Sequence, residues 1–219
     1  MVEISTSILN VEKDQATKIF YGLEVAHTDY FHIDVMDGKF VPKDTTELMK
    51  DYTNTVKQIS NIPIDVHLMV EDVKGFIDEY AGFNPNIITF HVEATKSKEE
   101  VKELIDYIKS QGIKVGLSVK PNTKIEEIYE FLPYIHLCLV MTVEPGLGGQ
   151  KLIPETLEKV SILKKYIDEN NIDIDIEVDG GIKPENIEDA KNAGANIFVV
   201  GTAIVNSDNM EETIEVLRK

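Results

Sequence analysis

The sequence predicts an α/β protein, folded as a single (β/α)8 TIM barrel over residues 1–219, and two observations predict it. Runs of strand character recur about every 27 residues, and an amphipathic helical pattern follows each run, which gives eight units of each kind in alternation. The stretch after the first run, SILNVEKD (7–14), contains no glycine, whereas an open doubly wound sheet usually has a glycine-rich turn there. No linker rich in Pro, Gly or Ser divides the chain, so we expect one domain.

Proline and glycine mark several boundaries of these elements. Pro63 precedes an apolar strand, and 101–108 repeats apolar residues at helical spacing until Gly112, which we expect to close that helix in a left-handed conformation. Pro154 and Pro184 stand where helices begin, since proline is tolerated in the first turn. The expected strands are 3–8, 30–35, 63–69, 86–91, 113–119, 136–142, 174–178 and 196–200. The expected helices are 11–25, 45–59, 72–81, 97–110, 124–131, 154–169, 184–193 and 209–218.

The charge balance excludes two classes of partner. The chain has 22 Lys and Arg against 39 Asp and Glu, a net charge of −17. Such a surface repels nucleic-acid phosphates and anionic lipids, so we expect neither nucleic acid nor a membrane as a partner. An anionic substrate must then be held by groups within its own binding site rather than by the overall charge of the protein. We find no secretory signal and no apolar stretch long enough to span a membrane, so we expect a cytoplasmic protein. Cys138 lies in an apolar run and has no partner for an internal disulfide, so we expect it to be a buried structural thiol.

Polar residues at the carboxyl ends of the expected strands suggest a metal site, because barrel enzymes place their chemistry there. His32 and Asp34 are two residues apart and so face the same side of a strand. If that side is the barrel interior, they meet His67 and Asp179 from two other strands. Two imidazoles and two carboxylates suit one divalent ion such as Zn²⁺, Fe²⁺, Mn²⁺ or Co²⁺ better than Mg²⁺ or Ca²⁺. The alternative is that the histidines are core residues and the aspartates are helix caps.

Glycines follow the last three expected strands and predict a second feature, an anion site. Backbone amides near a helix N-terminus can hold a phosphate without a Lys or Arg, and barrels often bind phosphate after strands seven and eight. The alternative is that these glycines only make turns. The glycines concerned are Gly146, Gly148, Gly149, Gly180, Gly181 and Gly201. Met36, Met69 and Met141 lie beside the polar positions, either as packing residues or as an apolar shield over the metal site.

Together these segments resemble the ribulose-phosphate 3-epimerase family, in family order and over nearly the whole chain. The matching segments are SIL (7–9), HIDVMDGKFVP (32–42), DVHLMV (65–70), HVEA (91–94), VMTVEPGLGGQKLIP (140–154), EVDGGI (177–182) and VVGTAI (199–204). The resemblance implies a TIM barrel of the ribulose-phosphate-binding type, an isomerase that inverts one carbon of a ketose phosphate in carbohydrate metabolism, and a homo-oligomer, either a dimer or a hexamer.

The resemblance also implies roles for individual residues. His32, Asp34, His67 and Asp179 would hold the divalent metal, and Asp34 and Asp179 would be the two acid/base groups that act through an enediolate. Ser7 and His67 would touch the substrate, and Met36, Met69 and Met141 would form a cap over it. The phosphate would lie on Gly148, Gly149, Gly181, Gly201 and Thr202, with Gly146 and Gly180 beside it. Because strands two and seven are expected to face each other across the barrel, their aspartates would reach opposite faces of the sugar.

The chain departs from the family pattern in loops that we expect to border the sugar. Lys43 and Lys120 replace the usual Asn, Leu147 replaces Phe, and Glu144 replaces Asn or Asp. The main prediction is epimerisation of D-ribulose 5-phosphate to D-xylulose 5-phosphate. The alternative substrate is D-allulose 6-phosphate, which would give D-fructose 6-phosphate, and a catalytically inactive sugar-phosphate-binding barrel is a remote alternative. A decarboxylase of the orotidine-phosphate type is disfavoured, since no strand supplies its Asp-x-Lys-x-x-Asp array.

Overall fold

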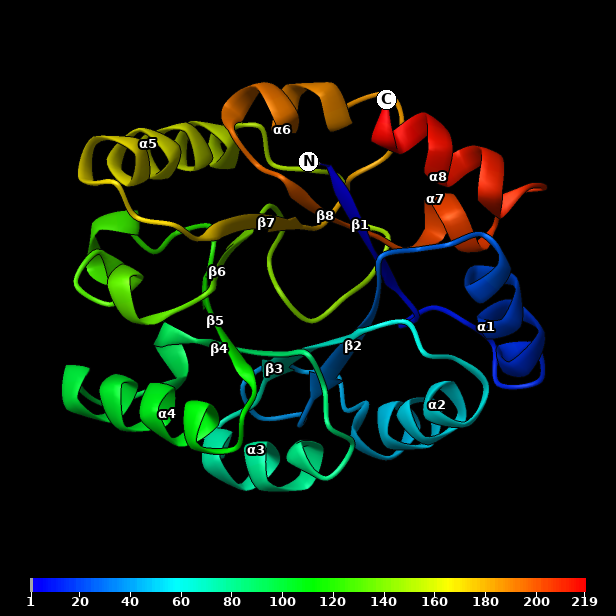
Figure 1. The fold of residues 1–219 in the computed structure, drawn as a ribbon, viewed down its shortest axis with the longest axis horizontal. Coiled ribbons are helices and arrows are strands. Elements are labelled where there is room, and N and C mark those ends of the chain that lie inside the picture. Colours follow the sequence, from blue (N-terminus) through cyan, green and yellow to red (C-terminus); the bar gives the residue numbers. More distant parts are fainter. Residues whose placement is uncertain (1) are drawn as a thin grey trace.

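The computed structural model describes residues 2–219 and has eight parallel strands closed into a barrel, each hydrogen-bonded to the next and β8 to β1. Figure 1 shows the helices arranged around the ring of strands. The strands are β1 (Glu3–Ser7), β2 (Tyr30–Met36), β3 (Ile64–Met69), β4 (Ile87–His91), β5 (Lys114–Val119), β6 (Leu137–Met141), β7 (Asp175–Asp179) and β8 (Ile197–Val200). The predicted fold class is confirmed, and every expected strand lies within two residues of its observed bounds.

Residues 2–219 also form eight α-helices and three 3-10 helices, of which the last two α-helices follow β8. The α-helices are α1 (Ala16–Val25), α2 (Thr46–Ile59), α3 (Val73–Ala81), α4 (Lys98–Ser110), α5 (Glu155–Asn170), α6 (Ile187–Ala193), α7 (Thr202–Val205) and α8 (Met210–Arg218). The 3-10 helices are η1 (Val92–Ala94), η2 (Ile125–Ile128) and η3 (Leu132–Tyr134). Gly112 ends the segment after α4 with a φ of +75°, as expected from its position.

One expected helix is wrong. The segment 124–131 forms the short 3-10 helix η2, and η3 follows it with Pro133 at its second position. Pro133 lies beyond the expected helix, and because it has no amide hydrogen to donate, an α-helix could not continue from η2 through η3 with its full set of hydrogen bonds. The short helix α7 after β8 was not expected at all. The first expected helix also begins late, at Ala16, because 13–15 form a turn.

Alternation along the strands separates the barrel interior from the outer apolar layer. The odd-numbered residues of β2 pack between the strands and the helices, whereas His32, Asp34 and Met36 face inward. Cys138 and Val140 of β6 likewise belong to the outer layer. A smaller apolar group fills the interior: Ile87, Leu137, Leu139, Met141, Val143 and Ile197. The predicted burial of Cys138 is confirmed, and burial raises the pKa of its thiol.

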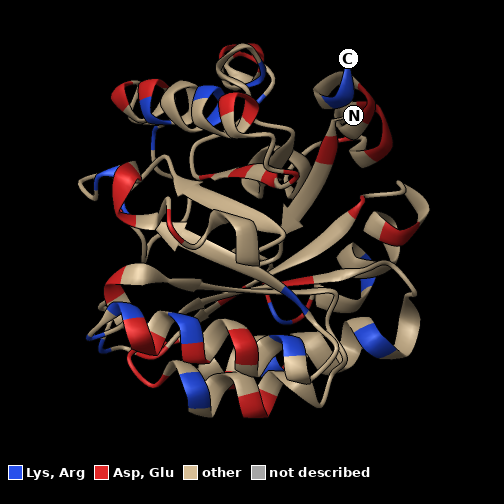
Figure 2. Ribbon diagram, turned by 60° about the vertical axis from the view of Figure 1, so that its left-hand side comes forward, with Lys and Arg blue, Asp and Glu red and all other residues tan. Residues whose placement is uncertain are grey.

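Charged residues lie mostly on the outer helices, as Figure 2 shows. The strands are buried on both faces, which is usual when helices cover a parallel sheet. The side chains that carry charge inside the barrel are therefore exceptions that need partners. No helix in the described part of the chain, residues 2–219, is both long enough and apolar enough to span a membrane.

Candidate active site

Three strands bring four metal-binding side chains together at the carboxyl end of the barrel. Asp34 of β2 is paired in register with His67 of β3, and His32 lies on the same face of β2 two residues earlier. Asp179 is the last residue of β7. One possible ligand atom from each of the four lies within 4.8 Å of those of the other three. The structure thus gathers all four residues that the sequence suggested as ligands.

The nitrogen atoms of both histidines point at both carboxylates. His67 Nδ1 lies 3.7 Å from Asp34 Oδ1 and 3.4 Å from Asp179 Oδ2. His32 Nε2 lies 3.5 Å from Asp34 Oδ1 and 3.9 Å from Asp179 Oδ2. His32 Nε2 and His67 Nδ1 are buried, and neither has a hydrogen-bond partner within residues 2–219. A buried nitrogen without a partner is costly, and two such atoms beside two carboxylates fit a divalent cation of the zinc or iron type.

The electrostatics of the cluster point the same way. Burial favours neutral imidazoles, yet the charges of Asp65 and Asp34 raise the pKa of His32 well above its usual value, and the neighbouring carboxylates of Asp179 and Asp34 raise the pKa of His67. Burial also opposes the charge on Asp34, but the adjacent His32 lowers the pKa of this carboxyl far below its usual range. The cluster therefore favours an added positive charge at its centre, whether it comes from protons or from a metal ion.

Asp65 and Glu177 form a second buried layer that sequence reasoning missed. His32 Nδ1 lies 2.6 Å from Asp65 Oδ2, which also accepts a hydrogen bond from Ser5 Oγ at 2.9 Å. Burial and the charge of Asp65 raise the pKa of Glu177 well above normal, so Glu177 holds a proton while Asp65 stays ionised. Because Nδ1 of His32 is paired with Asp65, its Nε2 is free to face the metal-binding cluster. Both acids lie two residues before a cluster member on the same strand, and that spacing was a usable signal.

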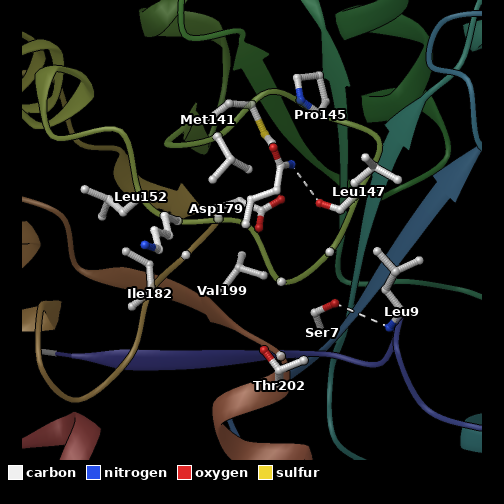
Figure 3. Close-up of a pocket in the computed structure, with 18 of the residues that line it drawn as sticks. Ser7, Leu9, Met141, Pro145, Leu147, Leu152, Asp179, Ile182, Val199 and Thr202 are labelled. Atoms are coloured by element: carbon white, nitrogen blue, oxygen red, sulfur yellow. Dashed lines mark hydrogen bonds between the residues drawn. The ribbon is translucent and has the colours of Figure 1, made fainter.

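The cluster borders a pocket of about 890 Å³ at the carboxyl end of the barrel. In Figure 3, Ser7 at the end of β1, Asp179 at the end of β7 and Thr202 at the start of α7 lie around this pocket. Ser7 Oγ donates to Asp34 Oδ2 at 2.7 Å, so one oxygen of that carboxylate is held and the other faces the histidines. The three methionines also line the pocket, and all are nearly inaccessible: Met36 (1% exposed), Met69 (1%) and Met141 (2%).

The predicted glycines gather on the same pocket from three loops. Gly180 and Gly181 have φ values of +119° and +70°, a region that side chains rarely adopt, and a Cβ on Gly181 would overlap the backbone of Leu152. The loop between β6 and α5 reaches over the middle of the ring in Figure 1. The predicted anion-binding residues that line the pocket are Gly146, Gly148, Gly149, Gly180, Gly181, Gly201 and Thr202.

Two other expectations about the site are corrected by the structure. β1 and β8 separate β2 from β7, so these strands are not opposite each other, because the strand opposite β2 in an eight-strand ring is β6. Lys43 and Lys120 do not line the pocket. Lys120 instead places Nζ 3.8 Å from the centre of the Phe40 ring, a cation–π contact.

Comparisons with known proteins agree with this arrangement. The sequence model of the ribulose-phosphate 3 epimerase family matches residues 3–205. The ribulose-phosphate 3-epimerase of Mycobacterium bovis is 39% identical over 191 residues, which cover 87% of this chain and 81% of that protein. The same-named protein of Methanocaldococcus jannaschii is 38% identical over 219 residues, which cover 100% of this chain and 91% of that protein. A ribulose-phosphate 3-epimerase of rice, described as the cytoplasmic isoform, is 39% identical over 87% of this chain and 82% of its own length.

The solved structures extend the likeness in fold. A Streptococcus mutans protein described as KGPDC has a TM-score of 0.72 over 99% of this chain and 95% of its own. Its sequence identity is 12%, so this likeness concerns the fold alone. The family match and the identities of 38–39% over most of the chain carry the assignment. The chain is a member of the ribulose-phosphate 3-epimerase family.

Proposed function

We propose that this isomerase inverts C3 of D-ribulose 5-phosphate to give D-xylulose 5-phosphate, with one divalent metal ion at His32, Asp34, His67 and Asp179. The observation that carries the proposal is the placement of two carboxylates at the wall of one pocket, with two buried imidazole nitrogens behind them that have no hydrogen-bond partner among residues 2–219. The same pocket holds the glycine loops that suit a phosphate. Zn²⁺, Fe²⁺, Mn²⁺ and Co²⁺ all match this donor set.

The reaction requires removal of a weakly acidic proton from C3, next to the C2 carbonyl. A bound divalent ion would stabilise the negative charge that develops on the substrate oxygens. Asp34 and Asp179 are the two groups that can take a proton from one face of C3 and return one to the other. A single base would favour return of the proton to its original face, which is why two carboxylates matter.

Other residues of the pocket hold this machinery in place. Ser7 fixes one oxygen of Asp34 through its 2.7 Å hydrogen bond, so the free oxygen keeps one orientation. The buried side chains of Met36, Met69 and Met141 exclude water beside the reacting carbon, which protects a strongly basic intermediate from uncontrolled protonation. Backbone amides of Gly149, Gly181 and their neighbours would hold the phosphate, and so a chain with a net charge of −17 can still bind an anion.

The competing substrate is D-allulose 6-phosphate, and a direct comparison tests the proposal. The relatives described above are named for ribulose phosphate, which favours the pentose phosphate. The metal-free protein would be reloaded with Fe²⁺, Mn²⁺, Co²⁺ or Zn²⁺ and assayed on both sugars. We expect the larger kcat/KM for ribulose 5-phosphate. A preference for the hexose phosphate would transfer the proposal to that substrate, and metal binding without activity on either would refute it.

We also propose that the protein is cytoplasmic, like its rice relative, and that it forms a homo-oligomer, a dimer or a hexamer. Three exposed apolar side chains support an interface between copies. Tyr21 and Val25 lie on α1 and Val216 lies on the neighbouring α8, with exposures of 62%, 53% and 46%. Light scattering after size-exclusion chromatography measures the mass directly, and a particle of 24.7 kDa would refute the oligomer.

A further inference from the structure

A buried hydrogen-bonded chain runs from the metal-binding cluster to the loop after β5. His67 Nε2 lies 2.9 Å from His91 Nε2, and His91 Nδ1 lies 3.1 Å from Glu93 Oε2. The two rings are stacked with centroids 5.0 Å apart, and both residues are fully buried. Neither His91 nor Glu93 lines the pocket, and the hydrogen-bonded chain reaches the metal-binding cluster through His67.

The direction of every hydrogen bond in this chain can be worked out from its far end. Glu93 Oε1 accepts from the backbone N–H of Lys120 at 2.7 Å and from the Thr123 hydroxyl. Although burial opposes the charge on Glu93, the hydrogen bond from His91 is the largest of several contacts that lower its pKa to about 2, so the carboxylate is ionised and can only accept. His91 Nδ1 must therefore carry the hydrogen and donate it to Glu93.

The remaining steps follow because a neutral imidazole has one N–H. A neutral His91 whose single N–H lies at Nδ1, facing Glu93, offers His67 Nε2 only the lone pair of its own Nε2, 2.9 Å away. His67 must then donate through its own Nε2. Its Nδ1 is left with a lone pair that faces Asp34 and Asp179, at the distances given above. That lone pair is what a metal ligand needs.

We propose that His91 and Glu93 are positioning residues that fix the tautomer of His67, so that its Nδ1 can bind the divalent ion. The inference rests on the metal site of the proposed function. His32 has its tautomer set in one step by Asp65, whereas His67 is set in two steps by a carboxylate anchored to the β5 loop. Metal binding is thereby coupled to a loop that does not touch the pocket.

The direction of these hydrogen bonds can be tested with Glu93→Gln, because the change replaces one oxygen by nitrogen and leaves the shape of the side chain almost unchanged. The N–H of Lys120 can only donate, so the amide oxygen of the variant stays at the Lys120 side. The amide NH₂ then faces His91 Nδ1 and donates to it. His91 must donate from Nε2 to His67 Nε2, and the hydrogen of His67 moves to Nδ1, where it blocks the metal.

The measurement is Mn²⁺ affinity of the metal-free protein, read from the free-ion signal in electron paramagnetic resonance, with ¹⁵N NMR of the histidine rings. For Glu93→Gln we expect about 10–100-fold weaker Mn²⁺ binding and a His67 ring protonated at Nδ1. Glu130→Gln is the matched control, because it removes an exposed carboxylate that pairs with Lys98 and Lys102 and should bind Mn²⁺ as the wild type does. Unchanged affinity or an unchanged His67 tautomer in Glu93→Gln would overturn the inference.

A second pair of variants keeps the test decisive if Glu93→Gln folds poorly. The amide of His91→Gln can accept from His67 and donate to Glu93, which preserves the polarity, whereas the ring of His91→Phe can accept nothing. We expect His91→Gln to bind Mn²⁺ at least about tenfold more tightly than His91→Phe. Equal affinities would show that the acceptor plays no part. A wild-type protein that binds no Mn²⁺ would refute the metal of the proposed function itself, and its epimerase activity would be judged separately.

Discussion

Replacement of either catalytic carboxylate by its amide isolates the two-base mechanism. In Asp34→Asn the amide oxygen can still accept the hydrogen bond from Ser7, so the side chain stays in place. Its NH₂ group then faces the nitrogens of His32 and His67, where the carboxylate Oδ1 stood. The variant loses a proton acceptor and an anionic metal ligand without a change in side-chain volume. Asp179→Asn makes the equivalent change from the other strand.

The expected loss can be estimated from the role of each group. A positioned acid or base contributes about 10²–10⁴-fold to the rate, or about 3–5 kcal/mol. The weakened metal site adds to that, so we expect kcat to fall by about 10³-fold or more. The phosphate glycines lie in loops after β6, β7 and β8 and are not altered, so affinity for a non-reacting pentitol phosphate should change little.

Turnover, metal content and proton exchange together form the assay. Each variant is loaded with Mn²⁺ at saturating concentration and its metal content measured, so that a lost base is separated from a lost ion. In D₂O the wild type should incorporate deuterium at C3 of both sugars. Each variant keeps one base and should exchange C3 in only one of the two epimers. Activity above a few per cent of wild type in either variant, or exchange in both epimers, would refute the two-base assignment.

Three further changes test other parts of the site. Gly181→Ala places a side chain on a residue with a φ of +70° and against the backbone of Leu152. The change should weaken a charge-assisted phosphate contact worth about 1.5–3 kcal/mol, so in steady-state assays KM should rise about 10–100-fold with a smaller effect on kcat. An unchanged KM would remove Gly181 from the phosphate site. Glu177→Gln should keep the Mn²⁺ affinity and lower the free energy of unfolding by less than about 1 kcal/mol, because Glu177 already holds a proton. Asp65→Asn should weaken Mn²⁺ binding, because Asp65 is ionised. The reverse order of affinities in a metal titration would contradict the assignment of that proton. Because the pKa of His91 is about 4 in the folded chain against 6.5 when exposed, the unfolded chain binds a proton first as pH falls, and stability that is complete above pH 6.5 is lost towards pH 4. In urea unfolding of the metal-free proteins, the free energy of unfolding of His91→Gln should fall between pH 6.5 and pH 4 by up to about 3 kcal/mol less than that of the wild type. The same dependence on pH in both proteins would be evidence against a neutral His91.

The sequence was most informative where a simple period governs the structure. Spacing of two residues placed His32 and Asp34 on one face, and alternation of strand and helix identified the closed barrel. These features are local, so one chain suffices to read them. The segment 124–131 failed because its apolar spacing fits one or two helical turns as well as a longer helix, and Pro133 lies just outside it.

The supporting residues were harder to predict because their role depends on contacts between strands. Glu93 lies beyond the end of β4, and its orientation depends on a hydrogen bond from the Lys120 backbone, 27 residues away in sequence. Asp65 and Glu177 share the inward face with predicted ligands, but nothing local says which layer of the barrel they occupy. Lys120 breaks a family motif in a loop that we expected to border the sugar, whereas in the structure its side chain packs on Phe40.

The contrast between an acidic exterior and an anion site made of backbone amides has a consequence for encounter kinetics. The helices around the barrel in Figure 2 carry residues of both charges, but Asp and Glu outnumber Lys and Arg over the whole chain, which gives a net charge of −17. A sugar phosphate therefore diffuses against a repulsive field until it reaches the short-range dipoles of the glycine loops. Dissolved ions screen the long-range repulsion, with a Debye length of about 10 Å at 0.1 M, but screen contacts inside the pocket much less. Productive encounters should thus become more frequent as potassium chloride is added, the opposite of the usual response of enzymes that steer anions with surface lysines.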